Sequence, residues 1–267
     1  MGIEVQSVNL PFLQIQIQLG SIVEQLFTQS PAWLLYIATF FYFLLLYFGF
    51  AFTGEYISKK FSMKNIGSKI GEKNLDNKQV KREITNSLVS ITVFGFFGVI
   101  PQLAYKWGWV NIQWFIDWKL FPLEMAVIFV WNDLHFYCCH WLLHRRWLFK
   151  RVHYIHHRSL HPTSFSTYSF HWVEAFLLST VMIIPMFFYD FCYLTLLLLP
   201  VMSIFLNTLG HWSYDLFPGD NRNKLLKCSV LHGIHHKKVH GNYGFFLHYF
   251  DSWFGTEIKS LNISGKK

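Results

Sequence analysis

A run of 21 residues without a single charge, Trp33–Thr53, constrains the fold more than any other part of the sequence. A helix needs about 20 apolar residues to cross the hydrocarbon core of a bilayer. The run is too long and too deep in the chain for the apolar region of a signal peptide. Only 14% of the residues are charged and 52% are hydrophobic, whereas a soluble chain carries about 25% charged residues. We therefore expect Trp33–Thr53 to be the first transmembrane helix.

Three further apolar stretches follow this run, at Leu88–Tyr105, Leu120–Leu143 and Trp172–Leu209. The last is longer than one crossing requires, and Pro185–Asp190 interrupts it, so we expect two crossings joined by a turn. The chain is thus predicted to be an all-α, polytopic membrane helical bundle with about four to five spans. Residues 1–30 contain the alternating stretch FLQIQIQLG, which fits either a short strand or an interfacial segment.

The basic residues predict the orientation of the bundle. Residues 54–83 hold eight Lys and Arg against four acidic residues, and the chain before Trp33 holds no Lys or Arg. The positive-inside rule puts this loop in the cytoplasm, and counting crossings brings every histidine cluster to the same face. The formal net charge of +8 is therefore explained by topology, and we expect no nucleic-acid partner. The four cysteines form no CxxC pair, which argues against a disulfide scaffold, a zinc ribbon and an iron–sulfur cluster.

All fourteen histidines lie after Asn132, and most of them occur at helical spacing. Offsets of 4, 7 and 11 would place Tyr137, His140 and His144 on the same helix face as Asp133. Offsets of 3 and 4 recur in the segments HYIHH and HGIHH. Pairs at these spacings are what a helix offers to one metal ion, and neutral imidazole is the commonest protein metal ligand. The clustered histidines are His140, His144, His153, His156, His157, His232, His235 and His236.

The remaining polar residues of this region have simpler interpretations. His135 points away from the predicted ligand face, and a structural role is favoured for it and for His161, His240 and His248. His171 fits a structural or a functional role equally well. Asp133 shares the ligand face, so we expect its carboxylate to hold the tautomer of a histidine. Glu124 is interpreted as structural.

Eight or more imidazoles exceed the needs of one ion, so the sequence predicts a dinuclear metal site. No HExxH motif suggests a zinc protease, and no repeated Glu-x-x-His pair suggests a carboxylate-bridged di-iron bundle. A nitrogen-rich pair of ions at a membrane surface favours iron and dioxygen, which can attack an unactivated C–H bond of a lipid. The alternatives are a zinc-dependent membrane hydrolase and a non-catalytic metal-binding membrane protein.

The chain resembles the fatty acid hydroxylase and sterol desaturase superfamily of membrane di-iron oxidoreductases. The resemblance runs from Asp133 to Thr256 and rests on HWLLH, HYIHH, HGIHH, SFHWVE, GHWSYDL, HGNYG and DSWFGT. It implies two iron ions, O2 as co-substrate and two external electrons, used to hydroxylate, desaturate or demethylate sterols or acyl lipids. It also implies that His211 is a ligand beside the eight clustered histidines. The first box departs from the commoner form, because Trp141 stands where an arginine usually follows the first histidine.

The expected organisation is a membrane region at 1–118, a catalytic domain at 119–258 and a short basic tail at 259–267, acting as one functional domain. The chain contains no GxGxxG stretch and no HPGG motif of a fused haem domain. The electrons are therefore expected from a separate cytochrome b5, ferredoxin or flavoprotein reductase. The membrane lipid substrate is expected to enter sideways from the bilayer.

Overall fold

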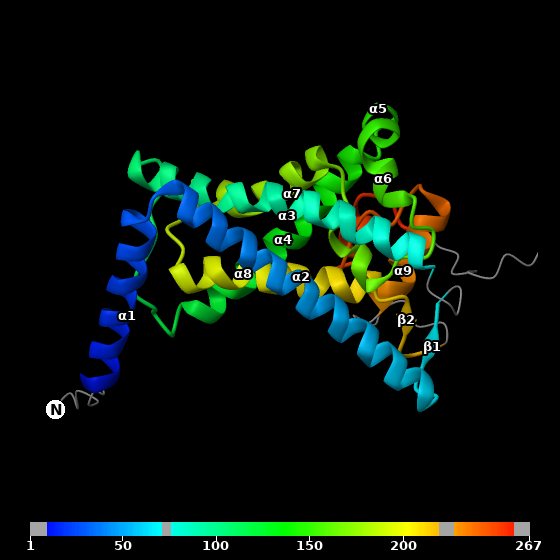
Figure 1. Ribbon diagram of the computed structural model, residues 1–267, viewed down its shortest axis with the longest axis horizontal. Coiled ribbons are helices and arrows are strands. Elements are labelled where there is room, and N and C mark those ends of the chain that lie inside the picture. Colours follow the sequence, from blue (N-terminus) through cyan, green and yellow to red (C-terminus); the bar gives the residue numbers. More distant parts are fainter. Residues whose placement is uncertain (1–9, 71–75, 219–226, 259–267) are drawn as a thin grey trace, which may run out of the picture.

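The computed structural model describes residues 10–70, 76–218 and 227–258. Five helices run along the long axis of the molecule and pack into one bundle (Figure 1). They are α2 (Ala32–Met63), α3 (Asn77–Lys106), α4 (Phe121–Leu143), α7 (Trp172–Met186) and α8 (Tyr193–His211). The expected all-α bundle is confirmed, since the only strands in the described part are two residues long each. The predicted tail at 259–267 lies outside the described residues.

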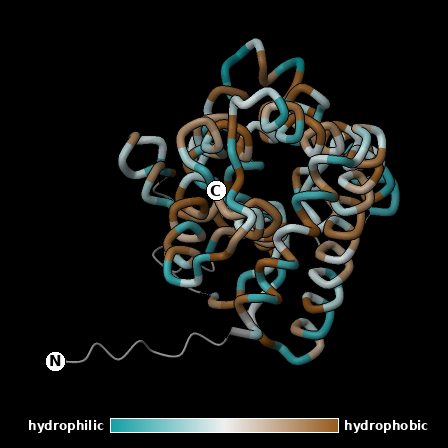
Figure 2. Tube along the Cα trace, turned by 90° about the vertical axis from the view of Figure 1, so that its left-hand side faces the viewer, coloured by the Kyte–Doolittle hydropathy of each residue, from teal (hydrophilic) through white to brown (hydrophobic). Residues whose placement is uncertain are grey.

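Three of these helices, α2, α3 and α8, are long and apolar enough to cross a membrane. Their exposed surface is rich in large apolar side chains such as Phe41, Leu45 and Phe96. Hydrophobic turns recur around the whole ring of helices when the bundle is viewed along its long axis (Figure 2). The protein is therefore an integral membrane protein. The other two helices fall short of this length or this apolar character. Helix α7 has only 15 residues, and α4 contains several polar side chains. The expectation of four to five crossings stays a prediction.

Two helices extend well beyond their predicted spans. The helix expected at Trp33–Thr53 continues to Met63, and the one expected at Leu88–Tyr105 begins at Asn77. Asp76 caps the second helix by accepting a hydrogen bond from the backbone N–H of Lys78 at 3.0 Å. Much of the loop expected at 54–83 is thus helical, since leaving the hydrocarbon core does not by itself end a helix.

The N-terminal segment is a helix, α1 (Leu10–Gln29), so the strand interpretation of FLQIQIQLG is wrong. Figure 1 shows α1 lying across the end of the bundle, far from the C-terminal elements. Gly20 lets α1 pack closely against the backbone at Trp114, because a Cβ there would lie 1.9 Å from the carbonyl oxygen of Trp114. Ile15, Leu19 and Leu26 remain exposed on α1, as an interfacial segment requires.

Short elements form a cap at the opposite end of the bundle (Figure 1). They are α5 (Arg146–Leu148), the π-helix η1 (Phe149–His153), α6 (Tyr154–His157), the 3₁₀ helix η2 (Ser164–Tyr168), α9 (Cys228–Lys238) and α10 (Tyr249–Trp253). Strand β1 (Ser68–Lys69) pairs with β2 (Tyr214–Asp215) and ties the basic connection after α2 to this cap. The lysine-rich segment and the cap therefore occupy the same end of the molecule.

Candidate metal centre

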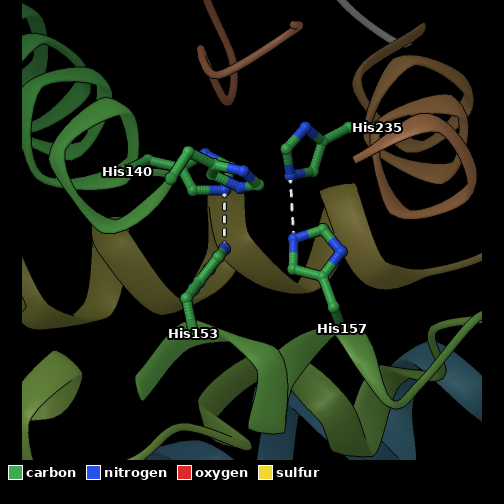
Figure 3. Close-up of side chains that lie close together, drawn as sticks. His140, His153, His157 and His235 are labelled. Atoms are coloured by element: carbon green, nitrogen blue, oxygen red, sulfur yellow. Dashed lines mark hydrogen bonds between the residues drawn. The ribbon is translucent and has the colours of Figure 1, made fainter. Parts of the chain in front are cut away.

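Nine imidazoles converge inside the cap from four separate segments of the chain. Within each group below, the candidate ligand atoms lie within 4.8 Å of one another. The first group is His140, His144, His153, His157 and His235, and the second is His156, His211, His232 and His236. In Figure 3, His140 and His235 approach from one side and His153 and His157 from the other. The nine residues are those that the sequence motifs predict as ligands, and the structure brings all of them together.

Each of the two HxxHH boxes divides its histidines between the two groups by spacing, whereas both histidines of HWLLH belong to the first group. The pairs at i, i+4, such as His153 with His157 and His232 with His236, fall within one group. The i+3 residue of each triplet, His156 or His235, joins the other group. Residues four apart lie about 40° apart around a helix, whereas adjacent residues differ by about 100°. The pattern HxxHH on one helix therefore contributes histidines to both groups. The π-helical turn η1 ends at the first histidine of the second box.

Hydrogen bonds to backbone carbonyls fix the tautomer of three of the nine rings, and a carboxylate oxygen faces the Nδ1 of a fourth. A backbone carbonyl can only accept, so in the three rings Nδ1 carries the proton and Nε2 is a free lone pair. The partners are the carbonyl of Tyr243 for His140 at 2.7 Å, the carbonyl of Gly241 for His235 at 2.7 Å, Glu174 Oε1 for His153 at 2.8 Å and the carbonyl of Asn207 for His211 at 2.8 Å.

The Nε2 atoms face one another without a donor between them. His140 Nε2 lies 3.1 Å from His153 Nε2, and the Nδ1 of His140 already holds its proton. The Nδ1 of His153 holds its proton when Glu174 is ionised, the form that a neighbouring cation favours. Protonating the second nitrogen is opposed, because burial and the neighbouring imidazoles hold the pKa of His153 well below its usual range. Burial likewise lowers the pKa of His235 to about 4. Facing lone pairs in a buried site need a cation between them.

The spacing of these nitrogens suits metal ions. Imidazole nitrogens bound to one ion at about 2.1 Å lie about 3.0 Å apart when they subtend a right angle. The His235–His157 pair lies at 3.1 Å in the first group, and in the second group the Nε2 of His232 lies 3.0 Å from those of His211 and His236. Five donors in one group and four in the other would leave open positions on six-coordinate ions. The residues present therefore fit two metal ions.

The five histidines outside the two groups have other surroundings. His171 begins α7, and its Nδ1 accepts a hydrogen bond from the backbone N–H of Val173 at 3.2 Å. His135 contacts Thr180 Oγ1 through Nε2 at 2.9 Å, on the side of α4 away from the metal groups. The remaining three are His161, His240 and His248.

The expected contact between Asp133 and a histidine is wrong. Its two carboxylate oxygens accept hydrogen bonds from the backbone N–H groups of Phe246 and Leu247, both at 2.9 Å. Tyr137, one turn further along α4, contacts Thr256 Oγ1 at 3.1 Å. The predicted helix face is real, but its first half anchors the C-terminal loop and only its second half faces the metal groups.

The carboxylate that does hold a histidine is Glu174, which the sequence reasoning missed. It lies in the first turn of α7, is 2% exposed and accepts from His153 Nδ1. Glu174 is an acidic residue within the predicted span at Trp172–Leu209, and an ionisable group at membrane depth is a functional candidate by default. Applying that rule to SFHWVE would have found it.

An apolar cavity of about 440 Å³ lies between the bundle helices; His135 lines it, and one layer of side chains separates it from the metal groups. Three of its lining residues contact metal-group histidines. The ring centroid of Phe136 lies 5.1 Å from that of His140, and the ring centroid of Phe170 lies 5.1 Å from that of His156. The backbone carbonyl of Asn207 accepts from His211 Nδ1. At its other end it is lined by Phe27 and Tyr193. Along α8, the fourteen-residue step from Tyr193 to Asn207 corresponds to about 21 Å.

Residues 125–256 match the family model described as fatty acid hydroxylase. Among similar proteins, the Delta(7)-sterol 5(6)-desaturase ERG3A of Gibberella zeae is 29% identical over 143 residues, which cover 52% of this chain and 38% of the relative. Methylsterol monooxygenase 2-2 of Arabidopsis thaliana is 29% identical over 56% of this chain and 59% of its own length. Very-long-chain aldehyde decarbonylase GL1-11 of Oryza sativa subsp. japonica is 30% identical over 52% of this chain and 54% of its own length.

The chain spans about half the length of the curated relatives it matches. No solved structure matches it significantly. The matched region contains all nine converging histidines, from the end of α4 to α9. The chain therefore belongs to the fatty acid hydroxylase and sterol desaturase superfamily.

Proposed function

We propose that this protein is a membrane-bound di-iron oxidoreductase that uses O2 and external electrons to hydroxylate or desaturate a lipid. One observation carries the proposal: nine imidazoles, eight of them buried, form two groups suited to metal ions and lie one side-chain layer beyond an apolar cavity inside a membrane bundle. An enzyme acting on a polar, water-soluble substrate would not need such a cavity.

The choice of iron rests on the ligands and on the relatives. Both groups consist of imidazole alone, without cysteine or carboxylate, which suits iron, copper or zinc. Two relatives are named as a sterol desaturase and a methylsterol monooxygenase. Iron with O2 supplies the oxidising power to break an unactivated C–H bond, which side chains cannot do. The residues of the chain would hold the ions, exclude water and position the substrate.

The lining of the cavity supports a lipid as the substrate. Its walls are Phe, Leu, Ile, Val and Met side chains with few polar groups. Ala38 on α2 and Leu197 on α8 line it and are themselves exposed, so a lipid can enter sideways between these two helices. Phe136 and Phe170 then position the reacting carbon beside the histidines. Sterols and acyl lipids both fit this description.

The proposal also covers the source of the electrons and the side of the membrane on which the histidine cap lies. The lysine-rich connection after α2 and the histidine cap share one end of the bundle. By the positive-inside rule this end faces the cytoplasm. A cytochrome b5, ferredoxin or flavoprotein reductase would deliver electrons there.

Lipid extracts test the proposed activity. Cells expressing the protein should contain a lipid that has gained one oxygen or lost two hydrogens, compared with cells expressing His157→Ala. A matched control is His161→Ala, which removes a histidine four residues along, outside both groups and outside the cavity lining, and should leave the product in place. Identical lipid profiles for the wild type and His157→Ala would contradict the proposal.

A further inference from the structure

The segment that follows the third histidine box makes a tight reversal after α9. Val239, Gly241 and Asn242 have φ values of 66°, 84° and 51°, so the chain turns through the left-handed region three times in four residues. Gly241 also has no space for a side chain, since a Cβ there would lie 2.6 Å from the carbonyl oxygen of Thr256. The reversal, residues 239–244, brings backbone carbonyls back toward the histidines.

Two carbonyls of this reversal hold two histidines of one group. The carbonyl of Gly241 accepts from His235 Nδ1, and the carbonyl of Tyr243 accepts from His140 Nδ1, both at 2.7 Å. His140 and His235 both belong to the five-histidine group. No hydrogen bond from this reversal reaches a member of the four-histidine group among the described residues.

A single buried carboxylate fixes the reversal in place. Asp251, which is 2% exposed, accepts hydrogen bonds from the backbone N–H groups of Tyr243 at 2.8 Å and Gly244 at 2.7 Å. It also accepts from Thr256 Oγ1 at 2.6 Å. Gly244 approaches so closely that a Cβ would lie 2.7 Å from Asp251 Oδ2. The carboxylate therefore holds the peptide whose carbonyl orients His140.

We infer that Asp251 is a positioning residue for the five-histidine group. It acts directly on the Tyr243 carbonyl that orients His140, and through Thr256, whose carbonyl accepts from the N–H of the Gly241–Asn242 peptide, on the carbonyl that orients His235. The inference rests on the proposed metal centre. Outer groups that orient a metal-binding imidazole typically change metal affinity by about 10- to 100-fold. Replacing Asp251 should weaken the binding of one ion and leave the binding of the other unchanged, because the hydrogen bonds of Asp251 lead to only one of the two histidine groups.

Asp133 provides a matched control. It is also a 2% exposed aspartate that accepts two backbone N–H groups of the same loop. The residues that it holds, Phe246 and Leu247, offer no carbonyl to a histidine of either group. Asp133→Asn and Asp251→Asn therefore weaken the loop by similar contacts, but only the second disturbs the orientation of ligands.

The test is anaerobic Fe²⁺ titration against a competing chelator, with thermal unfolding measured in parallel. The wild type should take up about two ions per chain. Asp251→Asn should keep one tight site and bind the other ion about 10- to 100-fold more weakly, whereas Asp133→Asn should keep two tight sites. Two tight sites in Asp251→Asn, or parallel weakening of both sites in the two variants, would overturn the inference.

A milder variant keeps the test decisive if Asp251→Asn does not fold. Thr256→Val removes one donor to Asp251 and leaves the carboxylate in place, and it should weaken one of the two sites by a smaller factor. Unchanged affinity at both sites in Thr256→Val would then overturn the inference. A folded wild type that takes up no metal would instead overturn the proposed function.

Discussion

The two ends of the bundle differ in whether their buried polar groups find hydrogen-bond partners in the protein. At the end near α1, the Glu124 carboxylate accepts hydrogen bonds from Tyr189 Oη at 3.1 Å, the Cys192 backbone N–H at 3.1 Å and Thr195 Oγ1 at 2.7 Å. At the cap end, buried imidazole nitrogens lie 3.0–3.3 Å from one another and crowd into two groups. Both ring nitrogens of His144 lack a hydrogen-bond partner in the described part of the chain.

The difference teaches how to separate a structural from a functional polar cluster. A buried polar group in a finished core is satisfied by protein partners, because leaving it unsatisfied costs about 1–3 kcal/mol. The Glu124 cluster meets that requirement with the chain alone. The histidine cluster does not, and in the proposed function two metal ions complete it.

Removing one metal-group histidine should have the largest effect on activity. His157→Ala deletes a donor of the five-histidine group, and we expect lipid oxidation to fall by at least about 100-fold while the protein still inserts and folds. Turnover by purified protein measures the loss. The control is His161→Ala, four residues along and outside both groups, and equal losses in the two variants would contradict the ligand assignment.

Removing the carboxylate at the opposite end should affect stability instead. Glu124→Ala leaves three donors without their acceptor, and we expect the free energy of unfolding to fall by about 2–4 kcal/mol. Metal content per folded chain should not change. Thermal unfolding and metal analysis of the same sample separate the two effects, and loss of metal at unchanged stability would break the contrast between the two ends.

Filling the cavity should separate substrate binding from metal binding. Ser203 on α8 is half-buried and lines the cavity between its two ends. Ser203→Phe should raise the KM for the lipid by about tenfold, since about 1.4 kcal/mol of binding would be lost to overpacking. The metal content should stay at the wild-type value. An unchanged KM would indicate that the substrate does not occupy this cavity.

His135→Ala should have the smallest effect. The side chain loses one contact with Thr180, so we expect a stability loss of about 1 kcal/mol and wild-type metal content. Calorimetry and metal analysis check this. Loss of an ion in this variant would show that the division of the α4 histidines by helix face is wrong.

The sequence predicted what depends on local spacing. Histidines at i, i+3 and i, i+4 lie close together on a helix whatever the rest of the chain does, so eight of the nine convergent residues could be named from spacing, and His211 from the family resemblance. The partner of Asp133 could not, because Phe246 lies 113 residues later and its position depends on the folded cap. Glu174 could have been found as an ionisable group in a predicted span, but its partner could not, since the chain reverses direction between His153 and Glu174. The helix ends of α2 and α3 were misplaced because hydropathy marks membrane depth and not helix length.

Metal analysis of protein purified under reducing, iron-replete conditions tests the two-ion interpretation of the cap. We expect about two irons per chain, bound by five and four imidazoles, together with O2-dependent oxidation of a lipid that is lost when iron is chelated. Stoichiometric zinc, with activity that is unchanged after iron chelation, would contradict it.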